Sequence, residues 1–178
     1  DEVLGCGGTI ACLADSGRNV HVLFLADGVS SREESDYPTS VQEALTVRKS
    51  AANEACRILG CCSVEFLSLP DNRLDELVLL DLVKQIEERI ASHNPNLILT
   101  HHRGDVNVDH RVAHDAVVVA CRPVPGNSVG ELLFFEVPSS TEWRPPMSSE
   151  SFVPNYFVDI SIALAQKKDA LAVYVNEI

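Results

Sequence analysis

Residues 97–110 read LILTHHRGDVNVDH and combine a strand, a polar loop and the start of a helix. The run at 97–100 is short and almost wholly apolar, which is typical of a strand covered on both faces. A polar loop follows at 101–109, and the pattern at 110–121 predicts a helix. A strand, a loop and a helix in this order predict one unit of a parallel sheet.

The same alternation extends along the chain in both directions. We predict further strands at 20–26, 64–67, 132–137 and 157–160. We predict further helices at 7–17, 41–59, 74–91 and 166–178. Strands that alternate with helices indicate an α/β fold in which a mostly parallel sheet carries helices on both faces.

The composition is that of one globular domain with an acidic surface. The chain has 178 residues, of which 46% are hydrophobic, and its net charge is −12. This charge argues against nucleic acid or an anionic membrane as the main partner. No apolar run approaches the ~18 residues of a membrane span, and no basic-then-apolar leader is visible. We therefore expect a cytoplasmic protein.

Six cysteines fall at no zinc-like spacing, and two of them are adjacent. We expect buried free thiols rather than a disulfide framework, because most of the cysteines lie inside apolar runs.

The loop at 101–109 and the helix after it are the first candidate site. Three histidines and two aspartates lie within residues 100–110, and imidazole and carboxylate are ordinary ligands for a hydrolytic divalent metal. The alternative is a solvated loop whose Asp109 caps the next helix, which would not explain the histidines. His114 lies one helical turn after His110, and a role behind the ligands or at the surface is favoured for it.

The N-terminal residues 1–9, DEVLGCGGT, are the second candidate site. Acidic residues before a glycine-rich helix start suit a metal-binding or anion-stabilising turn. The dinucleotide-binding pattern G-x-G-x-x-G fails here, because Ile10 stands at the third glycine position.

Together, the two segments carry a family resemblance. Asp-Glu-x-x-Gly-x-Gly-Gly at 1–8, followed by Gly-Asp-x-Asn-x-Asp-His-Arg at 104–111, resembles the PIG-L (LmbE-like) N-deacetylases. The resemblance extends along the chain through Leu-Pro-Asp at 69–71 and Glu-Val-Pro-Ser-Ser-Thr-Glu-Trp at 136–143. It implies a Rossmann-like three-layer sandwich and a single deacetylase domain over residues 1–178.

The resemblance also implies a zinc site. The family holds zinc with a histidine and the second aspartate of His-Pro-Asp-Asp-Glu, and with the histidine of the later Asp-His pair. The last two ligands correspond to Asp1 and His110 here. The first histidine and the general base would precede Asp1, so we expect a chain truncated at both ends that lacks its N-terminal strand.

Two further residues are catalytic candidates by the same resemblance. Asp109 is placed to orient or protonate a reacting group. Asn107 is placed to donate a hydrogen bond to the oxyanion that forms when an amide is hydrolysed.

Arg48 and Asp105 are the substrate-binding candidates. Arg48 can pair with a polar or anionic group of the substrate. The alternative for Arg48 is an ion pair on the helix surface with Glu54 or Glu43.

The expected function is a zinc-dependent hydrolase that removes the N-acetyl group from a small N-acetylglucosamine-type sugar or glycoconjugate. Another divalent metal is an alternative to zinc, and a homo-oligomer is an alternative to a monomer. The alternative is a nucleotide- or sugar-binding Rossmann-like module without hydrolytic activity.

Overall fold

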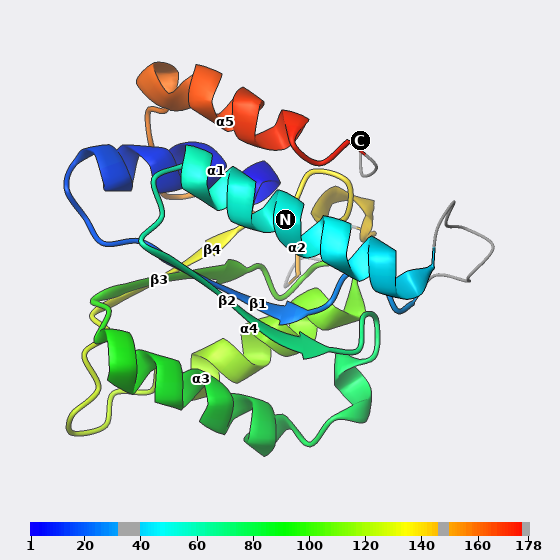
Figure 1. The fold of residues 1–178 in the computed structure, drawn as a ribbon. Coiled ribbons are helices and arrows are strands. Elements are labelled where there is room, and N and C mark those ends of the chain that lie inside the picture. The colour runs from blue at the N-terminus through cyan, green and yellow to red at the C-terminus, as the bar shows by residue number, and fades with distance from the viewer. Residues whose placement is uncertain (32–39, 146–149, 176–178) are drawn as a thin grey trace. The chain divides into compact units, whose positions relative to one another are not determined.

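The computed structural model describes residues 1–31, 40–145 and 150–175. The chain forms two compact units (Figure 1). We call Asp1–Asp71 with Pro154–Ile178 the first unit and Asn72–Val153 the second unit. Each unit contains one pair of parallel strands together with helices, which confirms the predicted α/β class.

The first unit is built on strands β1 (His21–Ala26) and β2 (Ser63–Leu69). They pair in parallel, with Phe24 opposite Phe66 and their rings stacked at 5.0 Å. Helices α1, α2 and α5 lie on one side of this pair (Figure 1). The bounds of these helices and of the 3-10 turn η4 are α1 Glu2–Asp15, α2 Val41–Ile58, η4 Ser161–Ala163 and α5 Leu164–Ala172.

Glycines at the start of α1 allow another part of the chain to pack closely against the helix. A Cβ atom at Gly8 would lie 2.7–2.8 Å from three side-chain atoms of Ile160. The strand predicted at 157–160 is therefore wrong: this segment has no regular secondary structure, and its last residue packs on α1. Phe157, an apolar residue of this predicted strand, is largely exposed.

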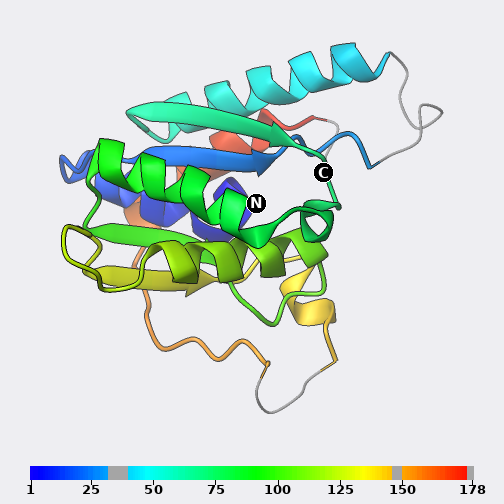
Figure 2. The ribbon, with the colours of Figure 1, turned by 90° about the horizontal axis from the view of Figure 1, so that it is seen from below.

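The second unit is built on strands β3 (Leu97–His101) and β4 (Glu131–Phe135), which also pair in parallel. Helices α3 (Leu79–His93) and α4 (Val108–Ala120) cover one face of the pair (Figure 2). The helix residues buried in this core are Leu82, Val83, Ile86, Ile90, Ala113, Ala116, Val117 and Ala120. Two short 3-10 turns complete the unit, η2 (Leu74–Glu76) and η3 (Thr141–Trp143).

Several element bounds differ from the predictions. Helix α1 begins at Glu2, five residues before the predicted start, with Asp1 as its N-cap residue. The helix predicted at 74–91 is divided into η2 and α3, since Leu77 and Val78 between them are extended. Within the described residues, the strands form two two-stranded parallel sheets, one in each unit.

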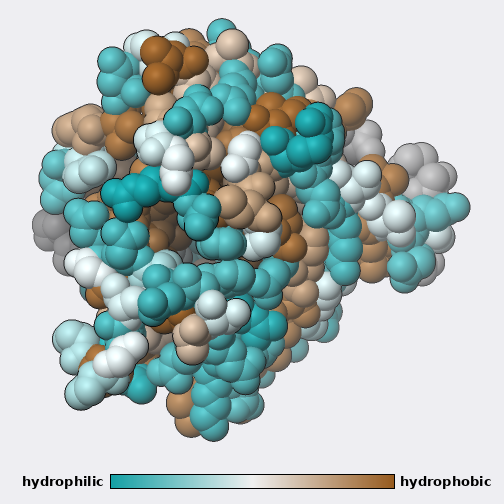
Figure 3. Space-filling model, turned by 60° about the vertical axis from the view of Figure 1, so that its left-hand side comes forward, coloured by the Kyte–Doolittle hydropathy of each residue, from teal (hydrophilic) through white to brown (hydrophobic). Residues whose placement is uncertain are grey.

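All six cysteines are free thiols, as predicted, although only Cys6 and Cys56 are buried and Cys62 is exposed. Among residues 1–31, 40–145 and 150–175, no helix is both long enough and apolar enough to cross a bilayer. Hydrophilic side chains predominate on the face shown in Figure 3, in keeping with the acidic composition.

Candidate active site

The loop from β3 to α4 is shaped by two short polar side chains that bind backbone N–H groups. Asp105 Oδ1 accepts a hydrogen bond from the N–H of Asn107 at 2.8 Å. Asn107 Oδ1 in turn accepts from the N–H of Asp109 at 2.8 Å, so Asn107 is the N-cap of α4. The cap that we considered for Asp109 therefore belongs to Asn107, two residues earlier.

This turn brings His101 and His110 together. His101 is the last residue of β3, and His110 lies in the first turn of α4 with only 7% of its surface exposed. The two rings are stacked, with centroids 4.1 Å apart and an interplanar angle of 19°. Their nitrogen ligand atoms lie within 4.8 Å of one another, a spacing that suits two ligands of one metal ion.

The carboxylate of Asp105 contacts the ring of His110. Its Oδ2 lies 3.0 Å from His110 Nδ1, and the Asp105 side chain is fully buried. Burial opposes ionisation, but hydrogen bonds from His110, the Asn107 N–H and Thr141 outweigh it and hold the pKa of Asp105 well below its usual value. The ionised carboxylate accepts a hydrogen bond from Nδ1–H, the tautomer that leaves the lone pair on Nε2, as in histidines that bind metals.

The hydroxyls of Ser140 and Thr141 complete the contacts of Asp105. Both donate to Asp105 Oδ2 at 2.8 Å. We did not assign a role to these residues from the sequence, although they belong to the 136–143 stretch that carries the family resemblance. His101 was also missed as a ligand candidate, although its place directly after an apolar strand is a usable signal.

Asp109 binds a different part of the second unit. Its Oδ2 accepts from the N–H of Asn72 at 2.7 Å, and its Oδ1 accepts from the N–H of Leu74 at 2.9 Å. The side chain is 7% exposed. Asp109 thus ties the turn before η2 to the start of α4, directly beside His110.

We expect Asp109→Asn to destabilise the protein by about 1–3 kcal/mol, because the new NH₂ group would face a buried backbone N–H. Urea unfolding of the variant and of the parent measures the difference. An unchanged midpoint and slope would show that the two hydrogen bonds to Asp109 contribute nothing net.

His114 contacts residues of the neighbouring strands β3 and β4. Its Nδ1 lies 3.0 Å from the carbonyl oxygen of His101, and its ring packs against Phe134. This position agrees with the favoured interpretation of His114 as a residue that supports the ligands.

Residues 150 and 152, which follow η3 in the chain, pack closely on the loop at 101–109 within the second unit. A Cβ at Gly104 would lie 1.7 Å from the backbone oxygen of Glu150, so only glycine fits there. Arg144 forms an ion pair with Glu150 at 2.6 Å, and Phe152 packs edge-on against His102. Trp143, the last residue of η3, is 68% exposed.

The first unit contains the other two predicted site residues. Asp1 is the exposed N-cap residue of α1. Arg48 lies on α2 with its guanidinium 5.4 Å from the ring centre of Tyr174. Glu54, one alternative partner for Arg48, forms a two-point ion pair with Arg57 at 2.6 and 2.7 Å.

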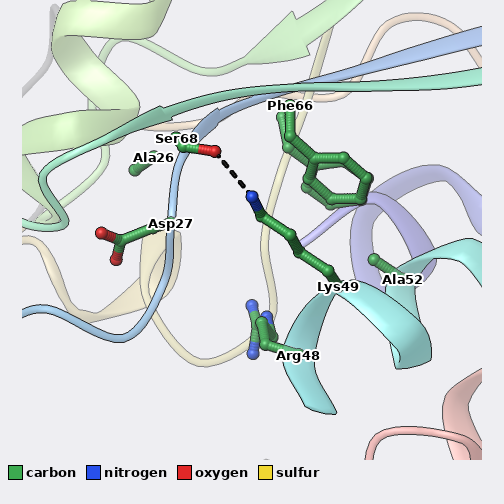
Figure 4. A pocket seen from close by; sticks show the side chains of 8 residues that line it. Ala26, Asp27, Arg48, Lys49, Ala52, Phe66 and Ser68 are labelled. Carbon is green, nitrogen blue, oxygen red and sulfur yellow. Dashed lines mark hydrogen bonds between the residues drawn. The ribbon is translucent and has the colours of Figure 1, made fainter. Parts of the chain in front are cut away.

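A small pocket lies at the ends of β1 and β2, beside α2 (Figure 4). Its volume is about 310 Å³, solvent at its mouth included. Lys49 donates a hydrogen bond to Ser68 across it at 2.9 Å, as Figure 4 shows. Together with Arg48, Lys49 makes one side of this pocket cationic.

The chain is similar to known proteins along its whole length. It is 28% identical over 173 residues to the uncharacterized deacetylase YaiS from Escherichia coli, covering 94% of this chain and 85% of that protein. It shares its fold with the N,N'-diacetylchitobiose deacetylase from Pyrococcus horikoshii (TM-score 0.77, 21% identity, 100% of this chain and 67% of that one). The 4-carboxy-2-hydroxymuconate hydratase GalB from Pseudomonas putida also has this fold (TM-score 0.78, 23% identity, 99% and 75%).

The family comparison agrees with these similarities and confirms the resemblance that the two sequence segments showed. Residues 1–121 match the PIG-L family, described as GlcNAc-PI de-N-acetylase. The match includes both segments and every candidate site residue named from the sequence. It also covers more than half of the chain, and the chain therefore belongs to the PIG-L family.

Proposed function

We propose that the protein is a metal-dependent hydrolase that removes the acetyl group from an N-acetylglucosamine-type sugar or glycoconjugate. Family membership and the deacetylase from Escherichia coli support the reaction. The chitobiose deacetylase, which acts on an acetylated amino sugar, supports the substrate class. The observation that carries the proposal is the buried pair of His110 and ionised Asp105 beside His101.

These residues fit a zinc ion by the chemistry of their donors. Two imidazoles offer nitrogens at a suitable spacing, and one of them is oriented by a buried carboxylate, the arrangement common behind zinc-binding histidines. We propose His110 and His101 as ligands from the second unit and Asp1 as a ligand from the first. The proposal of Asp1 as a ligand rests on its match to the family motif.

When bound, zinc polarises an amide carbonyl and lowers the pKa of its water to about 7. Side chains of the second unit are proposed to orient the metal ligands and to contact the amide that is hydrolysed. Asp105, which we predicted to bind substrate, is fully buried, and we propose that it orients His110 instead. Asp109, whose carboxylate accepts hydrogen bonds from the N–H groups of Asn72 and Leu74, is proposed to orient or protonate a reacting group. Asn107, the N-cap of α4, is proposed to donate a hydrogen bond from its side-chain amide to the oxyanion.

Arg48 is proposed to bind a polar or anionic part of the substrate from α2. We also propose that residues 1–178 belong to a single deacetylase domain. The small amino-sugar substrate and the cytoplasmic location remain predictions, and the oligomeric state remains open.

The fold alone does not select this reaction, because the hydratase GalB shares it. A suitable test incubates the purified full-length protein, with its zinc content measured, with N-acetylglucosamine and N,N'-diacetylchitobiose. A deacetylase releases acetate and free amine in equal amounts, and His110→Ala should release neither. Sugar binding without acetate release would reject the proposal and support the non-hydrolytic binding module.

A further inference from the structure

Three donors converge on one oxygen of Asp105. His110 Nδ1 lies 3.0 Å from Oδ2, and the hydroxyls of Ser140 and Thr141 each lie 2.8 Å from it. The other oxygen, Oδ1, accepts from the N–H of Asn107. Oδ2 therefore has more donors around it than its two lone pairs, and the four contacts on the two oxygens together fix the plane of the carboxylate.

The direction of the Thr141 hydroxyl is set by the backbone. Thr141 Oγ1 accepts a hydrogen bond from the N–H of Val137 at 2.8 Å. Because an N–H only donates, the hydroxyl proton of Thr141 is left to point at Asp105. Thr141 is itself 5% exposed, so water does not readily take over this contact.

Ser140 contacts both members of the pair. Its Oγ lies 2.8 Å from Asp105 Oδ2 and 3.4 Å from His110 Nδ1. Ser140 and Thr141 are more than thirty residues away from Asp105 in the sequence, and they approach it from the loop that follows β4.

We propose that Ser140 and Thr141 are positioning residues of the metal site, acting on His110 through Asp105. This inference rests on the proposed function, since it assumes that His110 binds a metal. The two hydroxyls keep the Asp105 carboxylate at the angle at which Oδ2 accepts a hydrogen bond from His110 Nδ1–H. Without them, only the Asn107 N–H and His110 itself hold the carboxylate, and the orientation of the His110 ring is less firmly fixed.

The expected size of the effect follows from the place of the two hydroxyls behind Asp105. Removing a residue that directly holds a metal-binding histidine typically weakens metal affinity about 10- to 100-fold. Ser140 and Thr141 act one step further away, so we expect the combined variant to weaken affinity by about 10-fold, the lower end of that range.

The experiment measures the dissociation constant for zinc by competition with a chromophoric chelator, using the full-length protein. The variants are Ser140→Ala, Thr141→Val and both together. Ser139→Ala is the matched control, because Ser139 lies on the same loop and contacts Glu142 through its backbone N–H. We expect weaker zinc binding in the double variant, parental binding in Ser139→Ala, and rescue in Thr141→Ser, which restores the hydroxyl.

Two reference variants separate this inference from the proposed function. If Asp105→Asn and His110→Ala weaken zinc binding but the hydroxyl variants do not, the positioning role is rejected and the metal site stands. If His110→Ala also binds zinc like the parent, the proposed metal site fails as well. Thr141→Val leaves the Val137 N–H without its acceptor, so if that variant does not fold, Ser140→Ala decides the outcome.

Discussion

His110→Ala is expected to abolish stoichiometric zinc binding and, with it, deacetylase activity. The substitution removes one of three protein ligands of the proposed site and leaves Asp105 buried without its histidine partner. Zinc content by elemental analysis and acetate release, measured on the same sample, test both parts.

The matched control is His93→Ala, which removes a histidine from the end of α3, in the same unit. This variant should keep the zinc and the activity of the parent. Full zinc occupancy in purified, folded His110→Ala would remove His110 from the site.

Gly104→Ala is expected to have the largest effect on stability among single glycine replacements in the second unit. The added methyl group would lie 1.7 Å from the backbone oxygen of Glu150 and 3.0 Å from His102. The His102 contact is to the side-chain atom Cε1, which can turn aside, but the Glu150 contact is to backbone and cannot, so the backbone at Glu150 must move away from Gly104. We expect a loss of about 3 kcal/mol, the upper end of typical overpacking costs.

Urea unfolding measures this loss, and the emission of Trp143, the only tryptophan, reports on the displaced loop. Gly130→Ala is the control: a Cβ there meets its nearest neighbour at 3.7 Å, an ordinary contact. Equal unfolding midpoints for the two variants would show that the close approach at Gly104 relaxes without cost.

The sequence predicts much of the fold because its strands are short apolar runs between polar loops. All of the predicted strands except the last are present, with bounds shifted by one or two residues. The exception, at 157–160, has the apolar residues of a strand, but Ile160 packs against Gly8 instead. Whether residues 157–160 form a strand depends on packing between distant segments, which local periodicity does not encode.

The site was predictable only where its residues are neighbours in the sequence. The density of histidines and aspartates at 101–110 pointed to the loop in which the structure brings His101, Asp105 and His110 together. Which of two aspartates faces His110 was not predictable, because it depends on how the turn at Asn107 directs Asp105 and Asp109. The hydroxyls of Ser140 and Thr141 reach Asp105 only through the pairing of β3 with β4.

The first unit is assembled from two chain segments with the whole second unit between them in sequence. Its closing contacts join residues far apart, such as Gln166 Nε2 to the oxygen of Ile58 and Lys167 Nζ to the oxygen of Leu4. During synthesis, the continuous second unit has all its residues available before α5 emerges. The first unit is completed only after α5 has emerged, and because its closing contacts join residues more than a hundred positions apart, we expect its completion to be the slower step of folding.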